Sequence, residues 1–425
     1  MSKRNIQAVI LAAGESSRFW PLNRVHKSLV KVMGKPIILY TVKGLVDSGI
    51  SDIVIIQGPN RAIERELKNY SEYSKHIKYI SQNEPKGMGN ALIQAKELLA
   101  EQFLLILADR VDCEEIFRKL SPKINASRSK TILVGAKTDT PYLFGILKLE
   151  KNRVVEIVEK PKKGEEQSNI KTLGIYLLTP AFFDTYKETK RHRYDFEEAL
   201  SVYMKKYHVE VMLWDKETPS LKYPWHLFEM QKYLFDKYLK KRIGKNPSIA
   251  KSAEIIGDVA IGDNVSIMEN VVIKGPCYIG NNIFIGNNSI LRGGVNIEDN
   301  CTIGANMEIK NSLVMEGSTT HAGFIGDSII GENCKIAGQF CTGNVRLDRK
   351  EVEAVVKGEK VETGKKYLGV TIGANTNIGI KSSTMPGVII GRNVIIGPST
   401  VVMKNIPDNT KYYTKFKEYV SKKNE

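Results

Sequence analysis

The chain has 425 residues, of which 42% are hydrophobic, and a formal net charge of +16. This length predicts two domains with sizeable cores, and lysines spread without interleaved aromatics argue against a nucleic-acid partner. Five cysteines without metal or disulfide spacing, and the lack of an apolar stretch long enough to span a bilayer, predict a cytoplasmic protein with no membrane partner.

The first predicted element is a buried parallel strand over residues 6–13, which ends at Gly14. A small polar turn, Glu15 to Arg18, follows it. At this place in an α/β fold, a turn presents backbone N–H groups to phosphate, and Gly14 lets a ligand approach because it has no Cβ. Arg18 and Lys27 add positive charge for a triphosphate. A plain strand-to-helix turn without a ligand is the alternative.

The run LAAGESSR at residues 11–18, followed by a Pro and a Lys, resembles the signature L-A-A-G-x-G-T-R of the sugar-1-phosphate nucleotidylyltransferases. The resemblance implies these nucleotide-binding and catalytic residues: Leu11, Ala13 and Gly14 for the nucleotide, and Arg18 and Lys27 for catalysis. The chain departs from the signature at Ser16, Ser17 and His26, the last of which stands where a Pro often precedes the Lys.

Strands and helices then alternate, which predicts a parallel, doubly wound sheet. The expected elements are a helix over 37–48, a strand over 52–57, a helix over 60–70, and strands over 77–80, 103–108 and 131–136. An amphipathic helix is expected over 229–241.

The run after the third strand contains Gln82, Gly87 and Gly89. In the family that the chain resembles, a Gln here and a Gly backbone read the edge of a uracil or thymine. Gln82 can donate and accept at once, as that edge requires, and both glycines would let the backbone approach the nucleotide. The resemblance thus implies UTP or dTTP as substrate, and an ordinary loop is the alternative.

Asp109 follows a predicted core strand, where a carboxylate is well placed to hold Mg²⁺. The resemblance implies that Asp109 is the metal ligand. In the family a second carboxylate lies four residues before a Pro-Trp step, but the matching residue here is Ser220. A neutral Ser is a poor ligand for Mg²⁺. The metal would then be held by Asp109, phosphates and water alone, or Asp215 or Glu217 would reach in.

Three further residues match the family's contacts to the sugar phosphate. Gly145 belongs to a Phe-Gly step whose backbone approaches the sugar, Glu159 would bind sugar hydroxyls, and Lys160 would contact the phosphate. Thr172 replaces the family's sugar-binding Asn.

From Ile249 onward an aliphatic residue recurs every six residues, from Ile255 to Ile309 and again from Ile372 to Val402. A hexapeptide period means three short strands per coil, each with one inward side chain. The pattern predicts a left-handed parallel β-helix, as in the hexapeptide acyltransferases. A helix that only assembles the protein is the alternative.

The ladder breaks at Met315 and His321, which occupy the in-phase positions. The run HAGFIGD at 321–327 resembles the H-x-x-Y-[LI]-G-D of bacterial-type glucosamine-1-phosphate acetyltransferase domains. His321 would take a proton from an amine as it attacks the thioester of acetyl-CoA. The resemblance implies these substrate-binding residues: Arg292, Lys310, Phe324 (in place of Tyr), Asn344 and Lys350.

The expected organisation is a Rossmann-like nucleotidyltransferase domain over 1–242, a linker over 243–248, a β-helix over 249–411 and a basic tail over 412–425, with 346–366 as an excursion loop. The arrangement resembles the bifunctional enzymes that make UDP-N-acetylglucosamine. It implies UTP or dTTP, N-acetylglucosamine-1-phosphate or glucose-1-phosphate, Mg²⁺, acetyl-CoA as co-substrate, and a homotrimer through the β-helix.

Three alternatives stay open at this point. One is a single-activity enzyme whose transferase half has decayed, which Ser220 motivates. Another is a non-enzymatic nucleotide-sugar-binding assembly subunit. The third is a glucose-1-phosphate thymidylyltransferase that carries an idle β-helix.

Overall fold

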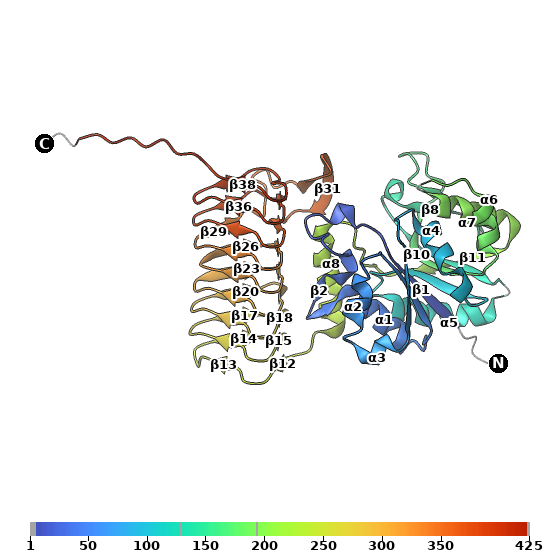
Figure 1. Ribbon diagram of the computed structural model, residues 1–425, viewed down its shortest axis with the longest axis horizontal. Coiled ribbons are helices and arrows are strands. Elements are labelled where there is room, and N and C mark those ends of the chain that lie inside the picture. The colour runs from blue at the N-terminus through green and yellow to red at the C-terminus, as the bar shows by residue number, and fades with distance from the viewer. Residues whose placement is uncertain (1–5, 128, 193, 423–425) are drawn as a thin grey trace. The chain divides into compact units, whose positions relative to one another are not determined.

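A computed structural model describes residues 6–127, 129–192 and 194–422 (Figure 1). Its internal contacts divide the chain into two compact units. The first contains the residues up to Glu15, then 25–30 and 36–220; the second contains 16–24, 31–35 and everything from Leu221 onward. Each unit is described by itself.

The first unit is built on a nine-stranded sheet with the order β5-β4-β1-β6-β10-β7-β11-β9-β8. Its strands are β1 (Gln7–Ala12), β4 (Ile53–Gln57), β5 (Ile77–Ser81), β6 (Phe103–Leu107), β7 (Thr131–Lys137), β8 (Gly145–Glu150), β9 (Arg153–Glu159), β10 (Ile170–Leu178) and β11 (Val209–Trp214). Its helices are α1 (Ile37–Asp47), α2 (Ala62–Leu67), α3 (Ser71–Ser74), α4 (Met88–Gln94), α5 (Cys113–Ala126), α6 (Phe182–Glu188) and α7 (Asp195–Lys206).

The sheet is mixed, so the expectation of a parallel sheet is wrong for part of it. Strands β5, β4, β1 and β6 run parallel, but β10 pairs antiparallel with both β6 and β7. The reason is the connection, because β10 follows the β8–β9 hairpin instead of a crossover helix. Strands β6, β7 and β11 still share a direction, so their carboxyl ends lie at one edge of the sheet.

Both faces of this sheet are covered by helices. Along β1 the side chains alternate between two cores, with Ala8 and Ile10 in one and Val9 and Leu11 in the other. The first core is completed by α1, α2 and α5, and the second by α4, α6 and α7. Burial on both faces explains why β1 reads as an unbroken apolar run.

The second unit holds a left-handed parallel β-helix made of three parallel sheets. The first sheet contains β12 (Arg242–Ile243), β15 (Val259–Ile261), β18 (Cys277–Ile279), β21 (Val295–Ile297), β24 (Leu313–Val314), β27 (Ile329–Ile330), β32 (Thr371–Ile372) and β35 (Ile389–Ile390). The second contains β13 (Ser248–Ile249), β16 (Ser266–Ile267), β19 (Phe284–Ile285), β22 (Thr302–Ile303), β25 (Thr319–Thr320), β28 (Lys335–Ile336), β33 (Asn377–Ile378), β36 (Ile395–Ile396) and β38 (Lys411–Tyr412). The third contains β14 (Glu254–Ile256), β17 (Val272–Lys274), β20 (Ile290–Arg292), β23 (Met307–Lys310), β26 (Gly323–Gly326), β29 (Phe340–Thr342), β34 (Ser383–Thr384) and β37 (Val401–Val402).

The six-residue ladder supplies the core of this helix, but its coils shorten after Ile309, where paired inward residues are 16 apart instead of 18. Val314 and Thr320 are buried and pair with Ile330 and Ile336 in the next coil. The prediction that His321 takes an inward position is therefore wrong. His321 directly follows β25 and its side chain is exposed, so the imidazole is accessible to a substrate.

Two segments differ from their expected roles. Residues 243–248 do not form a free linker, because β12 and β13 already pair with the next coil. The excursion over 346–366 contains an antiparallel hairpin of β30 (Val352–Val356) and β31 (Glu359–Lys365). The second unit also includes α8 (Leu227–Tyr238), somewhat earlier than the helix expected there.

Two short segments from early in the chain belong to the second unit by their contacts. Trp20 donates its indole N–H to Asp408 at 2.9 Å. The backbone N–H groups of Met33 and Gly34 donate to Asn296 at 2.9 Å and to Glu298 at 3.0 Å. The signature loop is thus divided between the two units at Glu15.

Candidate active sites

The loop after β1 leaves open space above Gly14. Gly14 and Glu15 are exposed, and a Cβ built on Gly14 would meet no atom within 4 Å. Packing therefore does not require a glycine here, and the missing Cβ leaves the backbone open to a ligand. Leu11 is buried beneath the loop, and Ala13 is half-buried. Arg18 lies in a short 3-10 turn, Ser17–Phe19, which belongs to the second unit.

Lys27 and Asp109 are brought together at the carboxyl edge of the sheet. The Lys27 ammonium lies 2.7 Å from Oδ2 of Asp109, whose side chain is only 6% exposed. Burial opposes ionisation of Asp109, but the charges of Lys27 and Arg110 outweigh it and hold the pKa of the carboxyl below its usual range. The ion pair places a fixed positive charge at the end of β6.

His26, which sequence reasoning left without a role, caps the turn that carries Lys27. Its Nδ1 lies 2.7 Å from the Ser28 hydroxyl and accepts from the Ser28 N–H at 3.3 Å. Burial, and then the charge of Lys27, lower the pKa of His26 to about 4. The imidazole is therefore neutral near pH 7, and it positions Lys27 without adding a charge.

The residues expected to hold Mg²⁺ do not form a carboxylate pair. Within the described residues, no three His, Cys, Asp or Glu side chains cluster as metal ligands. Ser220 is exposed. The carboxylate of Asp215 pairs with the Lys119 ammonium at 3.0 Å, so Asp215 does not join Asp109 as a second ligand. A hard cation prefers several carboxylate oxygens, but Asp109 is paired with Lys27 and the neighbouring Asp112 is paired with Arg110. These residues therefore do not supply the ligands that the chain would need to hold Mg²⁺.

Gln82 is buried, and its amide nitrogen is used inside its own loop. Nε2 donates to Oδ1 of Asn90 at 2.8 Å and to the carbonyl of Gly87 at 3.4 Å. Gly87 has a φ of 99°, which explains the glycine. Gly89 serves packing instead of ligand approach, because a Cβ there would clash with the Tyr186 ring.

The predicted sugar-phosphate residues lie close to one another. A Cβ on Gly145 would come within 2.8 Å of Oε2 of Glu159, so Glu159 lies over this glycine. The N–H of Lys160 donates to the carbonyl of Phe144 at 3.0 Å. Lys160 has a φ of 49°, an uncommon conformation for a lysine.

Sequence reasoning missed two acidic residues on α7. Asp195 is buried, accepts from the Tyr186 hydroxyl at 2.8 Å, and has an Oδ1 without a hydrogen-bond partner. Burial raises the pKa of Glu197 to about 7, and Glu159 adds to the shift. Neither residue belongs to a motif, so only the packing of α7 reveals them.

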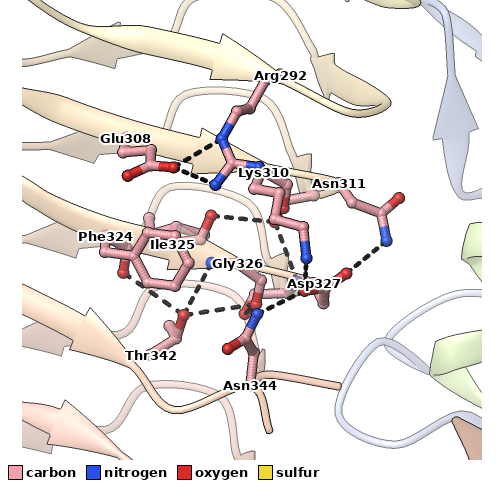
Figure 2. A network of polar contacts seen from close by, with 12 residues as sticks. Arg292, Glu308, Lys310, Asn311, Phe324, Ile325, Gly326, Asp327, Thr342 and Asn344 are labelled. Carbon is pink, nitrogen blue, oxygen red and sulfur yellow. Dashed lines mark hydrogen bonds and ion pairs between the residues drawn. The ribbon is translucent and has the colours of Figure 1, made fainter. Parts of the chain in front are cut away.

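The third sheet of the β-helix carries a polar network at its edge (Figure 2). Asp327 lies at its centre and accepts from Lys310 at 3.0 Å, from Asn311 at 2.7 Å and from Asn344 at 2.6 Å. Arg292 pairs with Glu308 one coil away, with Nε 2.7 Å from the carboxylate. The structure thus brings together Arg292, Lys310 and Asn344 on one surface, with each cation paired to a carboxylate.

Phe324 completes this surface. A Cβ on Gly326 would lie 2.5 Å from the Phe324 ring and 2.9 Å from Nδ2 of Asn344, so ring and amide meet over the glycine (Figure 2). Lys310 also lies over the Tyr367 ring, 4.7 Å from its centre. The sequence motif ends in Asp327. The central role of Asp327 in the network becomes visible only when neighbouring coils stack and bring its partners together.

His321 and Lys350 are not part of this network. His321 precedes β26 and Asp327 follows it, so the strand, about 13 Å of extended chain, separates them. His321 instead borders two surface hollows of about 420 and 700 Å³. Lys350 is exposed, and its N–H donates to Asp348 at 3.2 Å.

Known families match both units. A model described as nucleotidyl transferase matches residues 7–226. A model described as bacterial transferase hexapeptide (six repeats) matches 240–275 and 369–404, and one described as the GMPPB C-terminal domain matches 273–368.

Relatives match over nearly the whole chain. The bifunctional protein GlmU of Methanocaldococcus jannaschii is 32% identical over 96% of this chain and 97% of its own length. The bifunctional sugar-1-phosphate nucleotidylyltransferase/acetyltransferase of Sulfurisphaera tokodaii is 31% identical over 94% of this chain and 98% of its own. The chain belongs to the bifunctional sugar-1-phosphate nucleotidylyltransferase/acetyltransferase family. The resemblance inferred from the motifs is thereby confirmed.

No helix among the described residues is long and apolar enough to cross a membrane. The cysteines at 113, 277, 301, 334 and 341 form no disulfide, and four of them are buried.

Proposed function

We propose that the first unit transfers a nucleotidyl group from UTP or dTTP to a sugar-1-phosphate, either N-acetylglucosamine-1-phosphate or glucose-1-phosphate. The observation that carries this proposal is the open Gly14 loop at the same sheet edge as the Lys27–Asp109 pair. Phosphate groups bind at this edge of an α/β sheet, where backbone N–H groups and cations face them.

In the proposed reaction a sugar-phosphate oxygen attacks the α-phosphorus in line, and pyrophosphate leaves. Lys27 stabilises the developing charge from a fixed position, because His26 caps its turn and Asp109 holds its ammonium. Arg18 is the second predicted phosphate contact. The side-chain amide oxygen of Gln82 would accept a hydrogen bond from the base, since the amide nitrogen already bonds within the loop. Gly145, Glu159 and Lys160 would bind the sugar phosphate.

We propose that the β-helix acetylates glucosamine-1-phosphate with acetyl-CoA. The network of Arg292, Lys310 and Asn344 would bind the phosphate and sugar, with Phe324 against the ring and Lys350 as a further contact. The amine nitrogen attacks the thioester carbon, CoA leaves as the thiolate, and His321 takes the amine proton.

We infer that neighbouring copies complete this second site in a homotrimer. What supports this inference is that His321 and Asp327 lie at opposite ends of β26, about one strand length apart along the chain. A His321 from the next copy would meet the sugar phosphate bound at Asp327. Mixing His321→Ala chains with Lys310→Ala chains should restore part of the acetyl transfer, and light scattering should give three chain masses. Mixtures as inactive as each variant alone would contradict the shared site.

The free thiols fit the reducing cytoplasm predicted from the cysteine spacing. We propose the cytoplasm as the place of both reactions.

The experiment that tests the first activity is pyrophosphate release by the full chain with UTP or dTTP and a set of sugar-1-phosphates. Lys27→Ala should lower the rate at least a hundredfold, because one fixed charge in a transition state is worth about 3 kcal/mol. Lys43→Ala, which removes a half-buried lysine of α1 paired with Asp47, is the control. No release with any pair of substrates would favour the alternative of a decayed transferase.

A further inference from the structure

The end of β6 carries its own cation where a metal ligand pair would be expected. Asp109 and Arg110 are 5% and 4% exposed, and Asp112 is 1% exposed. Each carboxylate already has a cation, since Asp109 pairs with Lys27 and Asp112 with Arg110. Neither carboxylate is without a cation, although Oδ1 of Asp112 is buried without a hydrogen-bond partner.

Arg110 extends from the end of β6 toward the loop that contains residue 220. Its Nη1 donates to the carbonyl of Pro219 at 3.4 Å, directly before Ser220. Its Nε is buried without a hydrogen-bond partner. The guanidinium therefore links the two places, after β6 and at residue 220, where relatives of the signature family carry their paired carboxylates.

A second cation lies beside Arg110. Lys171, at the start of β10, is half-buried with its ammonium 4.4 Å from the centre of the Phe144 ring. Burial, and then the charge of Arg110, lower the pKa of Lys171. Lys171 also lines a hollow of about 600 Å³ at the carboxyl ends of β7 and β11.

We propose that Arg110 takes the place of the divalent cation in this unit, so that the chain binds a nucleoside triphosphate through side-chain cations and holds no metal between Asp109 and residue 220. The guanidinium is held at a fixed place between the two positions, by Asp112 on one side and the carbonyl of Pro219 on the other. This inference rests on the proposed nucleotide site. The neutral residue at 220 then follows, because a carboxylate has no metal to bind there.

A manganese titration of the nucleotide-free full chain, followed by electron paramagnetic resonance, tests the first half of the inference. Wild type and Ser220→Asp should bind no Mn²⁺ at sub-millimolar concentration. The double variant Arg110→Asn with Ser220→Asp should bind one Mn²⁺ per chain, at least tenfold more tightly than either of those two chains. A further Asp109→Asn should abolish this binding. One Mn²⁺ bound by wild type and lost in Asp109→Asn would overturn the inference.

Binding of UTP and dTTP to the full chain, in EDTA and then in Mg²⁺, tests the second half. Wild type should bind UTP or dTTP. Its affinity for that nucleotide in EDTA and its affinity in Mg²⁺ should agree within about threefold. Arg110→Gln should weaken binding in EDTA about fivefold or more, while Arg110→Lys, which keeps the charge, should weaken it less. Arg118→Gln, which removes an exposed arginine of α5, is the matched control.

Binding that requires Mg²⁺, or an Arg110→Gln chain that melts like wild type and binds equally well in EDTA, would overturn the inference. Absence of nucleotide binding in both buffers would contradict the proposed function. The manganese titration would still decide whether Arg110 has replaced the metal, since it uses no nucleotide.

Discussion

Gly14 is a residue whose identity the fold does not demand. No atom lies within 4 Å of the Cβ it would carry, and its φ is not in the left-handed region. We expect Gly14→Ala to melt within about 1 °C of wild type, because it adds neither clash nor strain. Nucleotide affinity should fall at least tenfold, because the methyl group occupies the approach of the phosphates. Calorimetry with UTP and dTTP measures the affinity, and unchanged binding would contradict the site.

Asp327 tests the β-helix network at the same scale. It has a φ of 49°, a conformation that Asn tolerates, so Asp327→Asn changes charge without backbone strain. Lys310 and Asn344 would lose a charged acceptor, worth about 1.5–3 kcal/mol. We expect KM for glucosamine-1-phosphate to rise about tenfold or more with a smaller effect on kcat. Asp236→Asn, on the exposed face of α8, is the control, and an equal effect there would remove the network's role.

At the scale of elements, the turns of the β-helix are held by stacked asparagines in the left-handed conformation. Asn282 has a φ of 56°, accepts from Asn264 at 3.1 Å and donates to Asn300 at 3.0 Å. Asn282→Ala should lower the free energy of unfolding by about 1–2 kcal/mol, because Ala resists this conformation and cannot continue the ladder.

Asn282→Gly separates the two causes of that loss. Glycine adopts the left-handed conformation freely, so only the ladder bonds are lost. We expect this variant to fall between wild type and Asn282→Ala in urea unfolding of the full chain. If both variants unfold alike, backbone strain does not contribute.

The same scale explains which elements sequence patterns predict well. Buried strands such as β4 and β6, and the largely buried α1, lie within a residue or two of their expected bounds because an apolar run is a local signal. The antiparallel β10 was not predicted, since direction depends on a connection and not on the strand's own residues. The shorter coils after Ile309 were also missed, because a ladder read in steps of six carries no signal for a change in coil length.

At the scale of the whole molecule, Glu298 joins parts of the second unit that are far apart in sequence. It accepts from the N–H of Gly34 and, at 2.7 Å, from Asn296. Burial raises its pKa from 4.5 to about 7. A carboxyl whose pKa is higher in the folded than in the unfolded state binds more protons when folded. Its contribution to stability is therefore present below pH 4.5 and is lost as pH rises toward 7.

We therefore expect wild type to lose up to about 3 kcal/mol of stability between pH 4.5 and 8 through this group. Glu298→Gln removes the titration, so the difference between variant and wild type should move in favour of the variant as pH rises. Urea unfolding of both chains at pH 5, 6, 7 and 8 measures this difference. A difference that does not change with pH would show that Glu298 titrates normally when folded.

The sequence by itself determined the family, the two folds and most of the candidate residues. Motifs such as the Gly14 loop and the His321 run are contiguous, and a hexapeptide period is a local repeat. Both kinds of signal can therefore be recognised from the sequence alone. Only the tertiary structure decided what those residues do beside one another. Arg110 reaches Pro219, Asp327 gathers Lys310 and Asn344, and β26 separates them from His321. These relations depend on which strands become neighbours, and residues distant along the chain meet only after the sheet and the coils have formed.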